Sequence, residues 1–315
     1  MTPAWGDLAD LVRAPAALSV PGDVAAGAAA VGAGGPRAVG LAGASVLLYW
    51  AGMAANDWAD RRLDATERPE RPIPSGRVAP AVALGVAAGL TTVGVALAGL
   101  VGGRRSLAVA VPLAGAVWVY DLVAKGGPAG PAVMATCRGL DVLLGASLGR
   151  RAGLGRRAGM LAAVPAAVTI GAHTWTVTAL SRREVSGADR WLPVATLGGT
   201  AVVAVSAVAT RWSRDLAVAG GRAVPSGGTG FRRNRSAALP AALASWYAAR
   251  YGAAQARAAV DPVAPRVRDA VGAGITSLPA LQGALAARAG AGLLGLAVAA
   301  AAPLGRRLAR RMSPT

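Results

Sequence analysis

Long apolar stretches separated by short polar segments make up almost the whole chain. Many of them are about twenty residues long, which is the length that an α-helix needs to cross a bilayer. The pattern predicts an all-α, polytopic membrane helical bundle. Counting the last two stretches, which Arg288 interrupts, as one bent unit gives about nine transmembrane helices. The predicted spans are residues 14–33, 37–56, 79–101, 106–124, 130–149, 159–180, 191–210, 237–257, 268–287 and 290–305.

Composition supports a membrane location independently of the spans. Hydrophobic residues make up 54% of the chain and charged residues 15%, and the mean hydropathy is +0.46. Soluble domains contain about 25% charged residues. Alanine and glycine are abundant, so the helices are expected to pack through small side chains. No break in composition suggests a second domain, and residues 1–315 are expected to form one transmembrane domain.

The net charge of +18 admits two interpretations. A pI of about 11.7 is typical of nucleic-acid-binding proteins. The arginines, however, lie in the loops between spans, which favours an anionic lipid surface and argues against a nucleic-acid partner. Arginine occurs in the 57–78 and 181–190 loops and, on the other side, in the 150–157 and 211–235 loops. The charge pattern therefore leaves the orientation in the membrane open.

A cluster of acidic residues follows the second predicted span. Asp57, Asp60 and Asp64 are spaced i, i+3, i+7, so on a continuing helix they share one face. Like charges at this spacing repel each other, and a cation among them would remove the repulsion. A membrane helix that ends in such a cluster is typical of a divalent-metal site at the lipid–water boundary.

Two further places put charge inside or at the end of a span, where ionisable groups are usually functional. Lys125, at the end of the fourth span, is the single lysine beside thirty-two arginines. It either binds an anion as a compact point charge or extends to the membrane surface. Arg138 and Asp141, in the fifth span, share a face at i, i+3. They either neutralise each other or line a pocket in which Arg138 binds a phosphate.

The sixth span and the loop after it carry weaker signals. His173 either lines the site or forms a hydrogen bond with a neighbouring helix. Glu184 and Asp189 are five residues apart, and a turn at Gly187 would bring them together as a second metal site. The alternative is an ordinary charged loop. Cys137 is the single cysteine, which excludes a disulfide within the chain and indicates a small packing residue.

The first acidic cluster resembles a known family motif. Asn56-Asp57-xx-Asp60-xxx-Asp64, followed by Arg71-Pro72-Ile73-Pro74-Ser75-Gly76, resembles the first aspartate-rich motif of the UbiA superfamily of intramembrane prenyltransferases. Arg13-Ala14-Pro15, and Tyr120 with Lys125, are similar to further features of that family. The segment Arg138-Gly139-Leu140-Asp141 and the Ser-Arg-x-Glu-Val-x-Gly sequence at 181–187 resemble a divergent branch found in Ebo-type gene clusters.

The resemblance implies helices around a central cavity in which Mg²⁺ bridges the carboxylates and the diphosphate of an isoprenyl donor. The acceptor would be an aromatic ring or a quinone or lipid precursor. Metal binding would fall to Asp57, Asp60, Asp64, Glu184 and Asp189. Lys125 and Arg138, with Asp57 and Asp60, would act on the diphosphate. The remaining predicted substrate-binding residues are Asn56, Arg71, Tyr120, Asp141 and His173.

Three hypotheses follow for the function. The first is Mg²⁺-dependent prenyl transfer in the cell membrane, with the active-site loops on the cytoplasmic side as the resemblance implies. The second is a non-catalytic member of the fold that binds or transports an isoprenoid or another lipophilic metabolite. It is favoured by the 181–189 region, which lacks the second aspartate-rich motif usual in the family. The third, an unrelated transporter, is disfavoured because no internal repeat is found.

Overall fold

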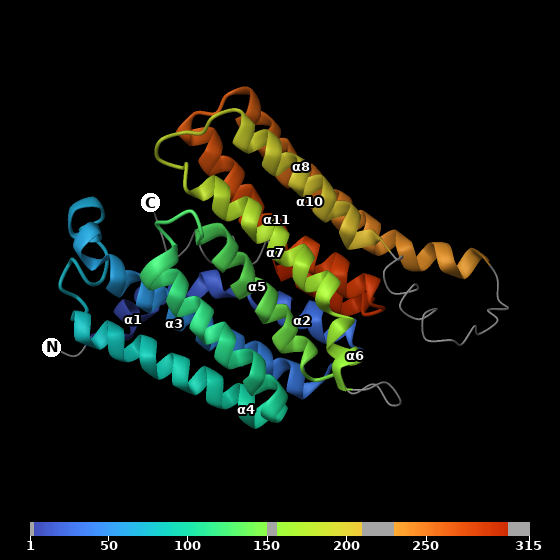
Figure 1. The fold of residues 1–315 in the computed structure, drawn as a ribbon, viewed down its shortest axis with the longest axis horizontal. Coiled ribbons are helices and arrows are strands. Elements are labelled where there is room, and N and C mark those ends of the chain that lie inside the picture. Colours follow the sequence, from blue (N-terminus) through green and yellow to red (C-terminus); the bar gives the residue numbers. More distant parts are fainter. Residues whose placement is uncertain (1–2, 150–155, 210–229, 302–315) are drawn as a thin grey trace.

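A computed structural model describes residues 3–149, 156–209 and 230–301, and this part of the chain is helical throughout, without a strand (Figure 1). The prediction of an all-α fold is confirmed. The elements are α1 (Trp5–Leu11), a 3₁₀ helix (Ala14–Ser19), α2 (Pro21–Ala30), α3 (Pro36–Glu67), α4 (Pro80–Val119), a π-helical turn (Tyr120–Ala124), α5 (Gly130–Ala146), α6 (Arg156–Leu161), α7 (Val164–Ser181), α8 (Trp191–Val208), α10 (Gly230–Val260) and α11 (Ala264–Arg288).

Five of the described helices are long and apolar enough to cross a membrane, so the chain is a multi-pass membrane protein. The predicted count of about nine spans is not confirmed. A shorter apolar helix covers Gly292–Ala301, within the predicted span at 290–305. The five helices are Pro36–Glu67, Pro80–Ala124, Gly159–Ser181, Trp191–Val208 and Ala264–Arg288.

The segment Pro80–Ala124 contains both of the spans predicted at 79–101 and 106–124. Gly103 has a φ of 69°, a backbone conformation that residues with a Cβ rarely adopt, and interrupts the helical geometry there. The chain reverses at this point, and α4 appears as two adjacent limbs in Figure 1. The second limb continues into the π-helical turn, whose last residue precedes Lys125.

The prediction of one continuous span at 14–33 is wrong. The chain forms a 3₁₀ helix over Ala14–Ser19 and then restarts as α2, which has only ten residues. Proline at the first position of α2 favours a new helix start because its missing N–H would be unpaired there anyway. Ten helical residues rise about 15 Å, roughly half the hydrocarbon core.

Helices α2 and α5 pack with almost no side chain between them. A Cβ on Gly27 would collide with the backbone carbonyl of Val142, and a Cβ on Gly145 would collide with that of Val24. This is the close approach through small residues that the composition predicts. The contact fixes the position of Asp23, on α2, relative to Arg138, on α5.

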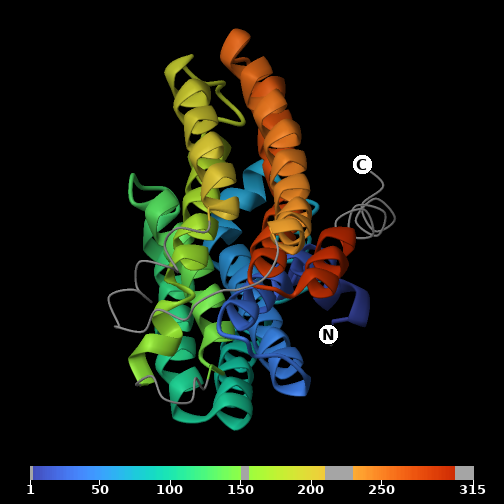
Figure 2. The ribbon, with the colours of Figure 1, turned by 90° about the vertical axis from the view of Figure 1, so that its right-hand side faces the viewer.

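The loops after α3, α7 and α10 meet at one end of the bundle, which we call the polar end (Figures 1 and 2). Glu184 interacts electrostatically with Arg68 and Arg268, and the Ala188 N–H donates to the Pro262 carbonyl at 2.9 Å. The arginine-bearing loops predicted for the other side, 150–157 and 211–235, lie largely outside the described residues.

Candidate functional site

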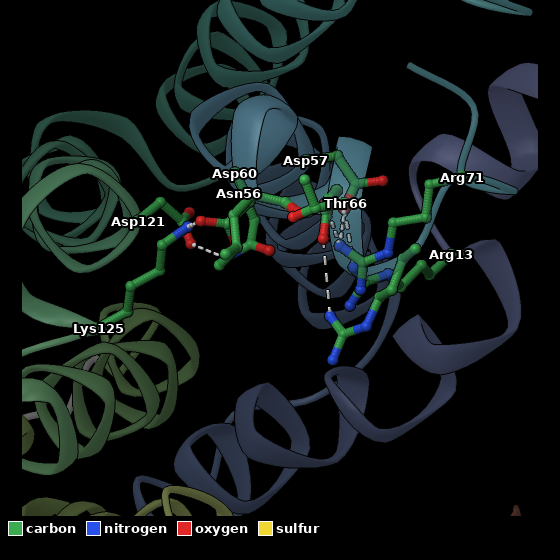
Figure 3. A network of polar contacts seen from close by, with 11 residues as sticks. Arg13, Asn56, Asp57, Asp60, Thr66, Arg71, Asp121 and Lys125 are labelled. Carbon is green, nitrogen blue, oxygen red and sulfur yellow. Dashed lines mark hydrogen bonds and ion pairs between the residues drawn. The ribbon is translucent and has the colours of Figure 1, made fainter. Parts of the chain in front are cut away.

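Two carboxylates at the end of α3 share one arginine. Arg71 Nη1 lies 2.6 Å from Asp64 Oδ2 and 3.3 Å from Asp57 Oδ1. Arg13 Nη2 lies 2.8 Å from the same Asp57 oxygen. Both carboxylates are buried, and Figure 3 shows the two guanidinium groups on the Asp57 side of the helix. The compact turn after Arg68 places Arg71 there, since the Ser75 N–H returns to the Arg71 carbonyl.

Asp60 lies at the same helix end and is directed toward Lys125 (Figure 3). Its Oδ1 is 2.7 Å from Lys125 Nζ. One turn earlier, Asn56 donates from Nδ2 to Asp121 Oδ1 at 3.1 Å. At 100° per residue, Asp57 and Asp64 project about 20° apart, whereas Asp60 is rotated by about 60° from Asp57. The shared face is therefore wide enough for its members to engage different partners.

Asp121 was not predicted as a site residue. It is buried and lies in the π-helical turn Tyr120–Ala124, between Tyr120 and Lys125 in sequence. Single π-helical turns occur often at functional sites because the extra residue redirects the side chains around it. The available signal was an acidic residue inside an apolar span, four positions before the single lysine of the chain.

A cavity of about 90 Å³ opens between α3, α4, the π-helical turn and α5, and Val20, just before α2, also lines it. Its polar residues fall into two groups, with Tyr120 and Asp121 toward the polar end and Ser45, Arg138 and Asp141 deeper. The cavity therefore contains three of the predicted site residues, namely Tyr120, Arg138 and Asp141. The walls between the two groups are largely apolar and include Leu48, Met53, Leu113, Val117 and Met134.

The predicted pairing of Arg138 with Asp141 does not form among the described residues. Arg138 Nε instead lies 2.8 Å from Asp23 Oδ2, and Gln282 Nε2 donates to Asp23 Oδ1 at 2.6 Å. Asp23 and Gln282 come from α2 and α11, and neither was predicted. Asp141 lines the cavity, and neither of its carboxylate oxygens has a hydrogen bond within the described part of the chain.

His173 lies away from the residues that line this cavity. It is buried between α7 and α10, where Nδ1 is 2.9 Å from the Tyr247 hydroxyl. The ring centroids of Tyr247 and Tyr251 are 5.3 Å and 5.5 Å from that of His173, both edge-on. The structure thus presents the inter-helix hydrogen bond that was the alternative interpretation of this residue.

Glu184 and Asp189 have separate partners at the polar end. Asp189 Oδ1 accepts a hydrogen bond from the Leu192 N–H at 3.0 Å, which caps the start of α8. Burial raises the pKa of Glu184, while the positive charges of Arg268 and Arg68 oppose that rise. Gly187, with a φ of 76°, forms the expected turn between the two acids.

Within the described ranges, no group of three or more His, Cys, Asp or Glu side chains is arranged to hold a metal ion. The oxygens of Asp60, Asp121 and Asn56 nevertheless are the hard ligands that Mg²⁺ accepts, and Mg²⁺ sites usually take a few protein ligands plus phosphate oxygens. Lys125 forms its ion pair with Asp60 and no further hydrogen bond within the described part of the chain. Its remaining N–H groups are available to an anion. The residues present therefore fit a site for Mg²⁺ and a diphosphate.

Comparison with known proteins relates both the sequence and the fold of this chain to one protein family. The model of the UbiA prenyltransferase family matches residues 19–213. An apo structure of a UbiA homolog from Aeropyrum pernix K1 has a TM-score of 0.60 at 18% identity, and the alignment covers 88% of this chain and 96% of that one. The chain belongs to the UbiA prenyltransferase family, and it shares the fold of that homolog.

Two relatives match parts of the sequence. Digeranylgeranylglyceryl phosphate synthase from Methanopyrus kandleri is 40% identical over 101 residues, which is 32% of this chain and 37% of that protein. The bacteriochlorophyll synthase 33 kDa chain from Cereibacter sphaeroides is 32% identical over 115 residues, which is 35% of this chain and 38% of that protein. The matched regions thus span less than two fifths of either relative.

Proposed function

We propose that this protein transfers a prenyl group from an isoprenyl diphosphate to a lipophilic acceptor inside the membrane, in a Mg²⁺-dependent reaction. The observation that carries the proposal is the meeting of Asp60, Asp121, Asn56 and Lys125 next to an apolar cavity. This arrangement joins oxygen ligands and a cation to a space that suits an apolar chain. Family membership supports prenyl transfer as the reaction class.

Lys125 would bind the diphosphate and Asp60, Asp121 and Asn56 would hold the metal. The ammonium group of Lys125 donates hydrogen bonds to diphosphate oxygens when the anion competes with Asp60 for it. Asp60, once released from Lys125, would be free to hold the metal together with Asp121. Bound Mg²⁺ would neutralise the charge that develops on the leaving diphosphate.

Asp57 and Asp64 were predicted as metal ligands, and their ion pairs suggest a different role, which is to position two arginines. They hold Arg13 and Arg71 beside the diphosphate end of the site, at 2.8 Å and 2.6 Å. Anchored guanidinium groups attract an anion without losing the side-chain freedom that exposed arginines would lose. In the proposed site these arginines draw the diphosphate toward Lys125.

The cavity would receive the reacting end of the prenyl chain. Tyr49 and Tyr120 line it and place aromatic rings where positive charge develops on the allylic carbon. The apolar walls exclude water, which would otherwise capture the allylic cation in place of the acceptor. The acceptor class in this proposal is an aromatic ring or a quinone or lipid precursor.

The polar end would face the cytoplasm in the cell membrane. It carries Arg68, Arg71, Arg182 and Arg183 in short loops next to spans. Because loops on the other side also carry arginine, this orientation follows the family resemblance and not the charge pattern. A soluble isoprenyl diphosphate would then enter the site from the cytoplasm.

The test is binding of radiolabelled geranylgeranyl diphosphate to the purified protein in detergent, with Mg²⁺ or with EDTA. We expect binding that requires Mg²⁺ and that falls at least about tenfold in Asp60→Asn and in Asp121→Asn, because each loses a charged ligand. Asp10→Asn is the matched control, since Asp10 pairs with Arg77 on the surface. Incubation of the same preparations with a membrane lipid extract should release diphosphate.

Two results would contradict the proposal in different ways. Binding that is unaffected by EDTA and by both variants would show that the acidic motif has no role in holding the donor. Metal-dependent binding without diphosphate release from any extract would favour the hypothesis of a non-catalytic carrier. Orientation is checked separately, by labelling a cysteine placed at Ser186 in intact cells and in inverted vesicles.

A further inference from the structure

The deep part of the cavity contains a buried carboxyl group whose oxygens form no hydrogen bond with the described residues. Asp141 is 3% exposed, and both of its carboxylate oxygens lack a hydrogen bond within the described residues. The Ser45 hydroxyl, on α3, interacts electrostatically with this carboxyl, although no hydrogen bond with full geometry forms between them. Both side chains line the cavity. Buried polar atoms are nearly always satisfied in folded proteins, so this pair points to a ligand.

The cation nearest in sequence, Arg138, acts on Asp141 only at longer range, because its ion pair is with another carboxylate. Arg138 Nε lies 2.8 Å from Asp23 Oδ2 and its side chain is 12% exposed. Asp23, which is fully buried, is held in turn by the Gln282 amide at 2.6 Å. The group of two carboxyls and one guanidinium therefore has more acid than base. The excess falls on Asp141, which is the member that faces the cavity.

Asp141 lies near the middle of the span predicted at 130–149. It is eleven residues into α5, counted from Gly130, which places it about 16 Å along the helix. An ionisable group at this depth, facing a cavity, is typical of a ligand site.

We propose that Asp141 and Ser45 bind the polar head of the acceptor, and that they select a neutral head bearing a hydroxyl over one bearing a carboxylate. The proposal rests on the proposed function, of which it specifies the acceptor. A buried carboxyl accepts a hydrogen bond from a hydroxyl donor in either protonation state. An anionic head would add a third acid to a group that contains one guanidinium, and burying that uncompensated charge is costly at this depth.

The two parts of the cavity differ in charge, so the donor and the acceptor would bind in different parts of it. Lys125 and the arginines of the polar end favour the anionic donor, whereas the deep part contains the excess acid. An anionic donor and a neutral acceptor would therefore bind in separate parts of the cavity before they react. Asp141 acts here as a substrate-binding and specificity-determining residue.

The experiment uses two probes of equal chain length, 1-hexadecanol and hexadecanoic acid, offered as an equimolar mixture to the purified full-length protein. Native mass spectrometry counts the bound molecules of each. We expect the alcohol to exceed the acid at least about tenfold in the wild-type protein, as a charge-assisted hydrogen bond would give. In Asp141→Asn the ratio should fall toward one, since an amide accepts and donates without charge.

The matched controls are Asp10→Asn, which removes one surface carboxylate, and Ser45→Ala, which removes the neighbouring hydroxyl. Asp10→Asn should keep the wild-type ratio, and Ser45→Ala should bind less alcohol without admitting the acid. An unchanged ratio in Asp141→Asn would overturn the proposal, and so would a wild-type preference for the acid or the binding of neither probe. No metal or diphosphate is present, so these outcomes are separate from failure of the donor site.

Discussion

The carboxylates near the polar end of the cavity form ion pairs, whereas the carboxyl group that lines its deep part does not. Near the polar end Asp57, Asp60 and Asp64 each lie within 3.3 Å of a basic nitrogen. In the deep part Arg138 forms its ion pair with Asp23, and neither carboxylate oxygen of Asp141 has a hydrogen bond or an ion pair among the described residues. A paired cluster can exchange partners when a diphosphate and a metal arrive together. An unpaired acid is ready for a neutral molecule that donates a hydrogen bond.

Position along the helices explains the difference. The side chains of Asp60 and Lys125 are 25% and 23% exposed, although the Lys125 ammonium nitrogen itself is buried, so water can assist from the Asp60 side when their ion pair opens. Asp141 is buried near the predicted middle of the membrane, where separating charges is far more costly. Exchange of ions is therefore expected at the polar end, and fixed selection is expected in the deep part.

The largest expected effect comes from removing the shared base of the polar end. Arg71→Met leaves Asp57 and Asp64 buried with half of their compensation lost. Breaking a buried ion pair in this way costs about 3 kcal/mol or more. The free energy of unfolding, measured in detergent with increasing denaturant, should fall by that amount. Arg71→Lys, which keeps the charge and loses the second donor arm, should recover part of it.

Lys125 is the next target, because the proposed exchange depends on it. Lys125→Met should weaken binding of geranylgeranyl diphosphate about 10- to 100-fold, the value of a hydrogen bond to a charged group. Lys125→Arg should bind more tightly than Lys125→Met, since the charge remains. Equal affinities of all three proteins in a filter-binding assay would remove Lys125 from the donor site.

The deep part can be disturbed through the helix contact that builds it. In Gly145→Ala the new Cβ would meet the backbone of Val24, so α2 and α5 must separate. Overpacking of this kind costs about 1–3 kcal/mol. Gly115→Ala is the matched control because nothing lies within 4 Å of its new Cβ. A lower melting temperature for Gly145→Ala alone is expected, and equal melting temperatures would refute the close contact.

The smallest effect is expected at an exposed counterpart of the Arg71 bridge. Arg77 also joins two carboxylates, those of Asp7 at 2.9 Å and Asp10 at 3.0 Å. These hydrogen bonds raise the pKa of Arg77 above its usual value. Arg77→Met should nevertheless change the free energy of unfolding by less than about 1 kcal/mol, because the pairs are solvated. A loss as large as that of Arg71→Met would show that burial does not separate the two bridges.

The helical, membrane-spanning nature of the chain followed from the lengths of its apolar stretches, and the spacing of Asp57, Asp60 and Asp64 anticipated the continuing helix that α3 forms as far as Glu67. These features are local, because a helix needs only a run of suitable neighbours and a span needs only length. The same reasoning failed at 14–33, where proline and a short apolar run produced a broken segment instead of one span. Asp121 was missed because its role depends on Asn56, 65 positions away.

The sequence by itself determined where charge would occur in the membrane and which family the motif resembles. Only the tertiary structure decided which basic side chain forms an ion pair with each carboxylate. Arg138 and Asp141 are three residues apart, yet Arg138 pairs with Asp23 on another helix. Gln282 reaches the same Asp23 across 259 positions. These choices depend on how closely small residues let α2, α5 and α11 approach, and no local pattern contains that distance.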